Sequence, residues 1–420
     1  MTAVAAAGAA ERIARALTTV LAAGFLCGCG GAPPPSSRPV MLHSEDDDAP
    51  RAGRSCSIVG SNTLPGRATI APPAVATLGE SLAVAWVVRA AGSRQVRAQQ
   101  LSHRFEPLGA AVDLFPDGEM PLNLGLAGCG SDLLVAWQLR EPDGESIRIS
   151  RLRAGDLRAD GPLLVAVPRG VQPALDCAGD LGALVWSIRD RGLQDVFLRW
   201  VSPADGRLSE PLRLSGETDA AANPGLACTD DRCAVVWSDR RAIYSEVYAT
   251  LIDAGGDAGA TPVRVSEHDQ SVSGAGGGYA PSVAVRGDGR FLVAWHDNRS
   301  RDESEIYATS LSHRGGAGRN HRVSRSPAPS TDAAVTSCGD DAGGVAWRDR
   351  RDGPPAVMFA ALDSRGRRQS AAMTLSGAVD ETSPPALVCV SDDTYAVAWT
   401  EASSETDGQG TLQLRLVGCR

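Results

Sequence analysis

The sequence predicts an all-β fold, a seven-bladed β-propeller of four-stranded antiparallel blades, closed by an N-terminal strand that completes the last blade. Three observations predict it. An apolar run ending in Trp recurs seven times, turn signals divide each repeat into four short strands, and the last repeat lacks its fourth strand while a strand without partners stands at the start of the folded region. Many small sheets that cannot bury their faces alone are typical of this architecture.

The repeat is anchored by runs such as CAVVW and FLVAW, whose Trp residues lie 51, 49, 51, 58, 52 and 52 residues apart. We number the repeats as units one to seven after Trp86, Trp137, Trp186, Trp237, Trp295, Trp347 and Trp399. The remaining Trp, Trp200, falls in a later strand of unit three. A bulky indole at one register in every unit predicts a structural wedge between neighbouring blades.

Unit five shows the four strands most clearly. They are expected at 281–285 (PSVAV), 291–295 (FLVAW), 306–311 (IYATSL) and 321–324 (HRVS). The second strand is apolar at every position, whereas a half-exposed strand alternates with polar residues, so both of its faces should be covered. Turn signals roughly every 8–12 residues favour strands over helices.

Closure of the ring is predicted from both chain ends. Unit seven ends with one strand after its Trp, Thr411–Val417, and the strand Ser55–Val59 is expected to pair beside it. Cys56 and Cys419 would then meet in a disulfide, which requires an oxidising compartment. Pairing of the two ends would leave no exposed sheet edge.

The other cysteines divide into two groups. Cys228 and Cys233 flank the tight turn CTDDRC, and a disulfide across this hairpin is predicted. Four more occupy nearly the same place in their own units and are expected to be buried free thiols, with pairing of 129 with 177 and 338 with 389 as the alternative: Cys129, Cys177, Cys338 and Cys389. No metal site is expected at Cys228 and Cys233, because further ligands are missing nearby.

The first 53 residues are expected to lie outside the fold. Residues 1–28 read as a signal peptide, since Arg12 and Arg15 precede the apolar run ALTTVLAAGFL. The run ends in Leu26-Cys27-Gly28-Cys29, which resembles the lipobox of bacterial lipoproteins and implies Cys29 as the lipidated residue. An ordinary signal peptide or an anchor helix is the alternative. Residues 29–53 are Pro-, Ser- and acid-rich and read as a disordered tether, which leaves 54–420 for the propeller.

The composition argues against two classes of function. The formal net charge is −9 without a basic patch, which argues against nucleic-acid binding. All 41 Lys and Arg positions are Arg, so Lys-based covalent catalysis is excluded. Motifs for cofactors are absent, and none is expected.

The two faces of the predicted disc differ. The turn face carries the short first-to-second and third-to-fourth turns. The loop face carries the long second-to-third loops and the connections between units, and we expect function there. Units four to six share Trp-x-Asp-x-Arg on the loop face, so the candidate binding residues include Asp239, Arg241, Asp297, Arg299, Asp349 and Arg351. A recurring Asp–Arg pair pins a loop more readily than it performs one reaction.

An insertion, Glu267–Tyr279, falls on the loop face of unit five. It is Gly-rich and reads as a mobile loop, or alternatively as a flap that offers His268 and Tyr279. His296 should lie on the same rim, and Tyr244 shares the face.

The pattern VAW-x-D-x-R followed by E-[IV]-Y-A resembles propeller repeats of uncharacterised surface lipoproteins of myxobacterial-type bacteria. The resemblance covers 55–419 and implies an exported outer-membrane or cell-surface protein held to the membrane by a lipid anchor. The leading hypothesis is a non-enzymatic binding or scaffold module for protein or polysaccharide. The alternative is a glycan-active, sialidase-like hydrolase, which would use Tyr244, Asp297 and the arginines of the loop face.

Overall fold

The structure is a computed structural model that describes residues 53–420. The exceptions are residues 91–92, 115–120, 143, 160–163, 191–192, 217–219, 242–244, 258, 268–280, 300–302, 378 and 403–409. The predicted signal peptide, Cys29 and most of the tether therefore lie outside the described residues. Every described residue belongs to one compact unit.

The described residues form an all-β fold without helices, and none of their segments is a helix able to cross a bilayer. Units two to six each form one four-stranded antiparallel sheet whose strands follow chain order. Unit two contains β6 (Pro121–Cys129), β7 (Asp132–Glu141), β8 (Gly144–Arg153) and β9 (Leu164–Pro168). Unit three contains β10 (Gly170–Ala178), β11 (Leu181–Asp190), β12 (Leu193–Val201) and β13 (Leu212–Arg213). Unit four contains β14 (Ala221–Cys228), β15 (Arg232–Asp239), β16 (Glu246–Asp253) and β17 (Val263–Arg264). Unit five contains β18 (Ser282–Val285), β19 (Phe291–Asp297), β20 (Glu305–Leu311) and β21 (His321–Arg322). Unit six contains β22 (Ser330–Cys338), β23 (Ala342–Asp349), β24 (Ala356–Leu362) and β25 (Met373–Thr374).

Units one and seven are joined into one nine-stranded sheet by the long N-terminal strand β1 (Cys56–Ala68). Unit one contains β2 (Ala74–Leu78), β3 (Ser81–Ala90), β4 (Ser93–Ser102) and β5 (Val112–Asp113). Unit seven contains β26 (Glu381–Thr382), β27 (Ala386–Ser391), β28 (Thr394–Ala402) and β29 (Gly410–Cys419).

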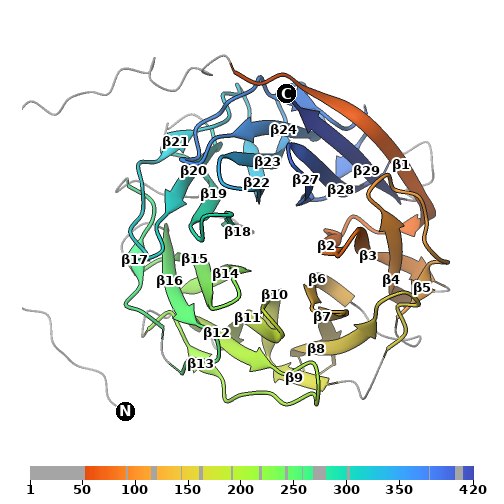
Figure 1. Cartoon of the computed structure of the whole chain (residues 1–420), viewed down its shortest axis with the longest axis vertical. Helices are drawn as coiled ribbons and strands as arrows, with labels where there is room; N and C mark the ends of the chain where they lie inside the picture. The colour runs from red at the N-terminus through yellow and green to blue at the C-terminus, as the bar shows by residue number, and fades with distance from the viewer. Residues whose placement is uncertain are drawn as a thin grey trace, which may run out of the picture. The chain divides into compact units, whose positions relative to one another are not determined.

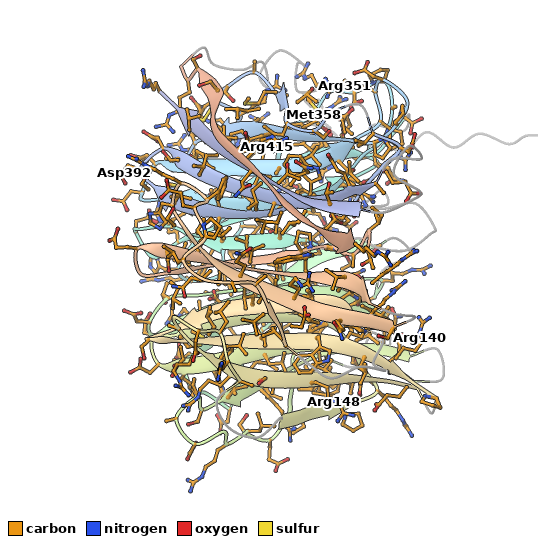
Figure 2. The ribbon with its side chains drawn as sticks, turned by 90° about the vertical axis from the view of Figure 1, so that its right-hand side faces the viewer. Arg140, Arg148, Arg351, Met358, Asp392 and Arg415 are labelled. Carbon is orange, nitrogen blue, oxygen red and sulfur yellow. A yellow bond between two sulfur atoms is a disulfide. The ribbon has the colours of Figure 1, made fainter. Side chains whose placement is uncertain are left out.

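The sheets follow one another around a common centre, with the first strand of each unit innermost (Figure 1). These first strands contact one another in succession, from β2 through β6, β10, β14, β18 and β22 to β27, and β27 contacts β2. Seen from the side, Asp392 of a first-to-second turn and Arg140, at the end of the second strand β7, lie near opposite edges (Figure 2). The turn face and the loop face are therefore on opposite sides, as the alternation of strand direction requires.

The core lies between consecutive sheets. Within the described residues, seven apolar clusters each combine the Trp of one unit with strand residues of the unit before it. One cluster packs Trp86 of unit one against Ala396 and Leu412 of unit seven. All seven indoles are at most 1% exposed. Each buries on the order of 150–250 Å², so the units stabilise one another in pairs.

The N-terminal strand is longer than predicted. β1 pairs antiparallel with β29, from Cys56 opposite Cys419 to Ala68 opposite Gly410, and Ala68 also pairs with Val88 of β3. The prediction stopped at Val59, before the Gly- and Pro-containing stretch GSNTLPG. The chain instead passes through a bulge after Ile58 and continues in register, burying Leu64 against unit one.

Two of the predicted disulfides are present, Cys56–Cys419 and Cys228–Cys233. The expectation of four free thiols is wrong, since Cys129 is bonded to Cys177 and Cys338 to Cys389. Each of these pairs lies near the ends of the first strands of two neighbouring units, where the Cα atoms are 5.5 and 5.4 Å apart. Equivalent places in adjacent repeats are close in space, and this proximity favours the alternative pairing.

Candidate functional site

The Trp-x-Asp-x-Arg motif forms a closed set of contacts within its own loop. In unit five, the indole of Trp295 donates to Asp297 Oδ2 at 3.1 Å, and Asp297 Oδ1 accepts the backbone N–H of Arg299 at 2.8 Å. Arg299 Nε returns to Asp297 Oδ2 at 2.7 Å, and its guanidinium lies 4.3 Å from the ring centre of Tyr307. The carboxylate thus ties a core indole to the start of a loop.

The same contacts recur in the other two copies. Asp239 accepts the indole of Trp237 at 2.9 Å, and Asp349 accepts that of Trp347 at 3.3 Å. The three carboxylates are at most 1% exposed, and Arg241, Arg299 and Arg351 each form an ion pair with the Asp of their own motif. The motif therefore pins loops, and none of its carboxylates reaches the surface.

The electrostatics of Asp349 fit this role. Burial raises its pKa, but the hydrogen bonds and charge of Arg351 outweigh burial and hold the pKa below its usual value. The carboxylate therefore remains ionised and paired at neutral pH, as a loop anchor requires.

The remaining loop-face candidates do not gather into a described site. Tyr244, His268 and Tyr279 lie outside the described residues. His296 is 2% exposed, its Nδ1 lies 3.5 Å from the backbone N–H of Asp332 in unit six, and burial lowers its pKa to about 4. A neutral, buried imidazole at the seam between two units has a packing role.

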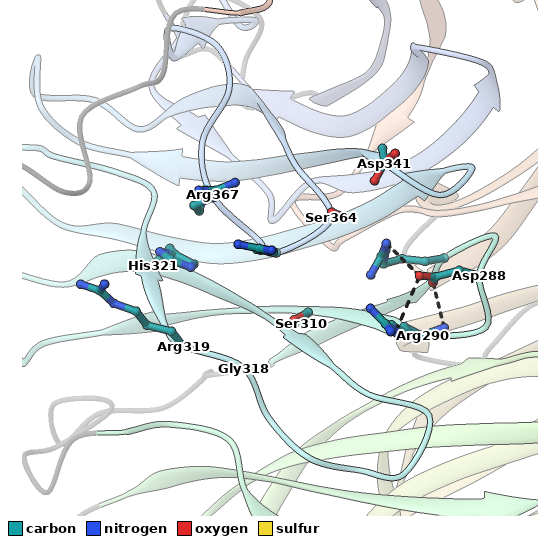
Figure 3. Close-up of a pocket in the computed structure, with 11 residues that line it drawn as sticks. Asp288, Arg290, Ser310, Gly318, Arg319, His321, Asp341, Ser364 and Arg367 are labelled. Atoms are coloured by element: carbon teal, nitrogen blue, oxygen red, sulfur yellow. Dashed lines mark hydrogen bonds and ion pairs between the residues drawn. The ribbon is translucent and has the colours of Figure 1, made fainter.

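A cavity of about 570 Å³ lies instead on the turn face, between units five and six (Figure 3). It is lined by the first-to-second and third-to-fourth turns of both units. The lining residues are Arg286, Asp288, Arg290, Ser310, Gly318, Arg319, His321, Asp341, Ser364, Arg365 and Arg367.

The turn at 286–290 builds one wall of this cavity. Arg286 is buried, with 4% of its surface exposed. Its Nε donates to the carbonyl of Asp340 in unit six at 3.1 Å, and its Nη2 forms an ion pair with Asp288 at 3.0 Å. Gly287 donates its N–H to the carbonyl of Gly339 at 3.0 Å, and a Cβ there would lie 2.3 Å from Asp340 Oδ1. This close approach fixes the turn of unit five against that of unit six.

The cavity is strongly cationic. Five arginines face two aspartates, which leaves a formal charge of +3 in a chain whose total is −9. Asp288 is already shared between Arg286 and Arg290, and Arg367 is held at 2.6 Å by Asp363, which lies outside the lining. Arg319 and Arg365 are exposed. Figure 3 shows Arg367 and His321 on one side of the cavity and Arg290 on the other, so a ligand between them would meet cations on two sides.

A second cavity of about 690 Å³ adjoins it between units four and five and shares Arg286 and Asp288. The Cys228–Cys233 hairpin forms part of its lining, together with Asp230 and Asp231. In the described part of the chain, no three His, Cys, Asp or Glu side chains are grouped so that they could hold a metal ion.

The sequence did not point to this face. Its turns are short and similar, and each contributes only one or two of the arginines. The five come together only because units five and six are adjacent, so the one available signal was the repeated Arg in the turns 286–290, 312–319 and 364–367.

No known family model matches the sequence, and no curated protein matches it with significant similarity. Solved structures resemble it in fold. A protein of unknown function from Dyadobacter fermentans has a TM-score of 0.52 at 10% identity, over 87% of this chain and 99% of that one. The polysaccharide lyase Uly1 has a TM-score of 0.50 at 12% identity, over 84% of this chain and 90% of that one. At these identities the likeness concerns the fold, which is propeller-like.

Proposed function

We propose that the protein is an exported, lipid-anchored, seven-bladed β-propeller that binds an anionic polysaccharide in the arginine-lined cavity between units five and six. The cavity is the observation that carries this proposal. It combines five arginines with enough volume for a sugar unit, in an otherwise acidic protein.

The blade count and closure are supported by the core. Each of the seven indoles packs between its own unit and the unit before it, and Trp86 packs between unit one and unit seven. The pairing of β1 with β29 supplies the outer strand that unit seven otherwise lacks. In this interpretation, each unit is one blade and β1 belongs to the last.

Export and anchoring rest on separate features. Four disulfides in one domain are typical of oxidising compartments outside the cytosol. The lipobox-like stretch ending in Cys29 supports a lipid anchor, and we place the protein at the outer membrane or cell surface.

The ligand class follows from the charge of the cavity and from the fold. Guanidinium groups bind carboxylate and sulfate oxygens through paired hydrogen bonds. The similarity in fold to a polysaccharide lyase supports a sugar polymer as the carrier of those anions.

Calorimetric titration of the purified protein with uronate-bearing and sulfated polysaccharides, at low and at high salt, tests the proposal. We expect binding of the acidic polymers that weakens as salt rises. The double variant Arg319→Ala/Arg365→Ala should weaken binding about fivefold, because two exposed charges that contribute about 0.5 kcal/mol each amount to ~1 kcal/mol. Arg104→Ala, an exposed arginine in the equivalent third-to-fourth turn of unit one, is the matched control. Equal affinity of the double variant and the native protein would contradict the assignment.

A glycan-active enzyme is the second candidate, favoured by the same similarity in fold. The hydrolase hypothesis required Asp297 at an accessible site, yet Asp297 is buried and bonded to Trp295 and Arg299. Release of shortened or unsaturated sugars from the polymers that bind would establish an enzyme. Turnover that survives Arg319→Ala/Arg365→Ala would place the reaction outside this cavity.

A further inference from the structure

In units two, five and seven, the side chain that follows the Trp contacts the backbone of the next unit. In unit two, Gln138 Oε1 accepts the backbone N–H of Gln172 in unit three at 3.0 Å. In unit five, His296 plays the same part toward Asp332 of unit six. In unit seven, Thr400 donates its hydroxyl to the carbonyl of Ala71, which leads into unit one, at 3.1 Å.

The linked residues of units three, four and six have left-handed backbones within bulges of the first strands. Gln172, Asn223 and Asp332 have φ values of 56°, 55° and 57°. Asn and Asp tolerate this conformation, whereas Gln has no such preference. A residue in a strained backbone conformation persists where its surroundings or its function require that side chain. The left-handed backbone does not favour Gln, so the presence of Gln172 needs another reason.

Units three and four depart from the common pattern through a pair of carboxamides. Gln172 Oε1 accepts the backbone N–H of Asn223 at 3.0 Å, and Gln172 Nε2 donates to Asn223 Oδ1. Both side chains are half-buried, and the Nδ2 of Asn223 donates to no described residue. This carboxamide pair lies on β10 and β14, among the innermost strands (Figure 1).

The hydroxyl of Ser187 is buried without a hydrogen-bond partner among the described residues. Ser187 follows Trp186 and so occupies the linking position of unit three, but the N–H that it would bind in unit four is already taken by Gln172. Its hydroxyl is left buried, with the residue 1% exposed, and without a partner among the described residues. A buried hydroxyl in this state calls for a water molecule or a ligand hydroxyl.

We propose that the carboxamide pair Gln172–Asn223, with Ser187 behind it, is a second binding site that takes an uncharged, hydroxyl-bearing ligand, a neutral sugar. The polar side chains named at this place, Gln138, Gln172, Asn223 and Ser187, are all uncharged. Carboxamides offer both donors and acceptors, which matches the hydroxyl groups of a sugar. The site differs from the arginine-lined cavity in its place and in the charge of its ligand.

Calorimetric titration of the full-length protein with neutral oligosaccharides of glucose, mannose and galactose tests this proposal. Asn223→Gly removes the carboxamide and keeps the left-handed backbone without steric cost. We expect it to weaken sugar binding at least tenfold while the unfolding midpoint changes little. If this variant unfolds earlier, Asn223→Asp is measured instead, which tolerates the same backbone and replaces the donor with a negatively charged acceptor.

Two controls keep the sites apart. Arg319→Ala/Arg365→Ala should leave neutral-sugar binding unchanged, and Asn223→Gly should leave binding of acidic polymers unchanged. Neutral sugars that fail to bind at millimolar concentration would overturn the proposal. So would equal affinity of Asn223→Gly, Asn223→Asp and the native protein.

Discussion

Cys56 and Cys419 lie directly opposite each other on antiparallel strands, with Cα atoms 4.1 Å apart, although 363 residues separate them in sequence. The disulfide between them ties the first strand of the described fold to the last. Because it closes so long a loop, it restricts the unfolded chain far more than a hairpin disulfide does.

Removing this disulfide should therefore be costly. We expect Cys56→Ser/Cys419→Ser to lower the free energy of unfolding by up to about 5 kcal/mol, and Cys228→Ser/Cys233→Ser, with a separation of 5, by about 2 kcal/mol. Urea unfolding of both variants under oxidising conditions measures the difference. A larger loss in the hairpin variant would contradict the loop-length argument.

Asp297 should matter for stability more than for binding. In Asp297→Ala, the buried indole N–H of Trp295 and the guanidinium of Arg299 lose their shared acceptor, which should cost about 2–4 kcal/mol. Asp341→Ala, an exposed carboxylate on the turn face, should change stability by no more than about 0.5 kcal/mol. Thermal and urea unfolding give both values. If Asp297→Ala leaves the free energy of unfolding unchanged, the loop of unit five is held by other contacts.

His296 should make the protein sensitive to acid. Burial lowers its pKa to about 4, partly opposed by Asp332 and Asp297, whereas the unfolded chain has the ordinary value near 6.5. The stability that its neutral form provides is complete above pH 6.5 and is lost as pH falls through about 4. The loss is on the order of 3 kcal/mol.

His296→Gln isolates this effect, since Gln138 shows that a carboxamide can accept the same inter-unit N–H. We expect the variant to match the native protein near pH 7.5 and to exceed it near pH 4.5 in urea unfolding. If the free energies of unfolding of the variant and the native protein differ by the same amount at every pH in this range, His296 is not the responsible group.

Cys29→Ser tests the proposed anchor. Without the thiol that would carry the lipid, the protein should leave the membrane fraction and should not incorporate labelled fatty acid. Arg12→Ala, which leaves the lipobox-like stretch intact, is the control. Fatty-acid labelling of the Cys29→Ser protein would assign the modification to another residue.

The strands could be predicted because burial on both faces leaves a simple trace, an apolar run with Trp at a fixed register. The length of β1 could not, because Gly60, Pro65 and Gly66 resemble a turn until β29 is placed beside them. Likewise, Cys129 and Cys177 look like isolated thiols until neighbouring units are brought together. Each error concerns a contact between units, which is a relation between distant parts of the chain.

The candidate site was less predictable than the fold. Loop length directed attention to the loop face, where Asp239, Asp297 and Asp349 proved to be buried anchors. The arginines of the turn face gave no comparable pattern, because Arg290 and Arg365 come from separate turns of different units. A cluster of charges built from two neighbouring units has no recognisable pattern in a single sequence.

The bond between β1 and β29 also alters what a protease could achieve. A single cut in any connection between Cys56 and Cys419 would open the covalent circle without releasing a fragment, and the nicked molecule would separate into pieces only after reduction. For the same reason the native ends could be fused and new ones opened at another turn, giving a circularly permuted protein with the same packing.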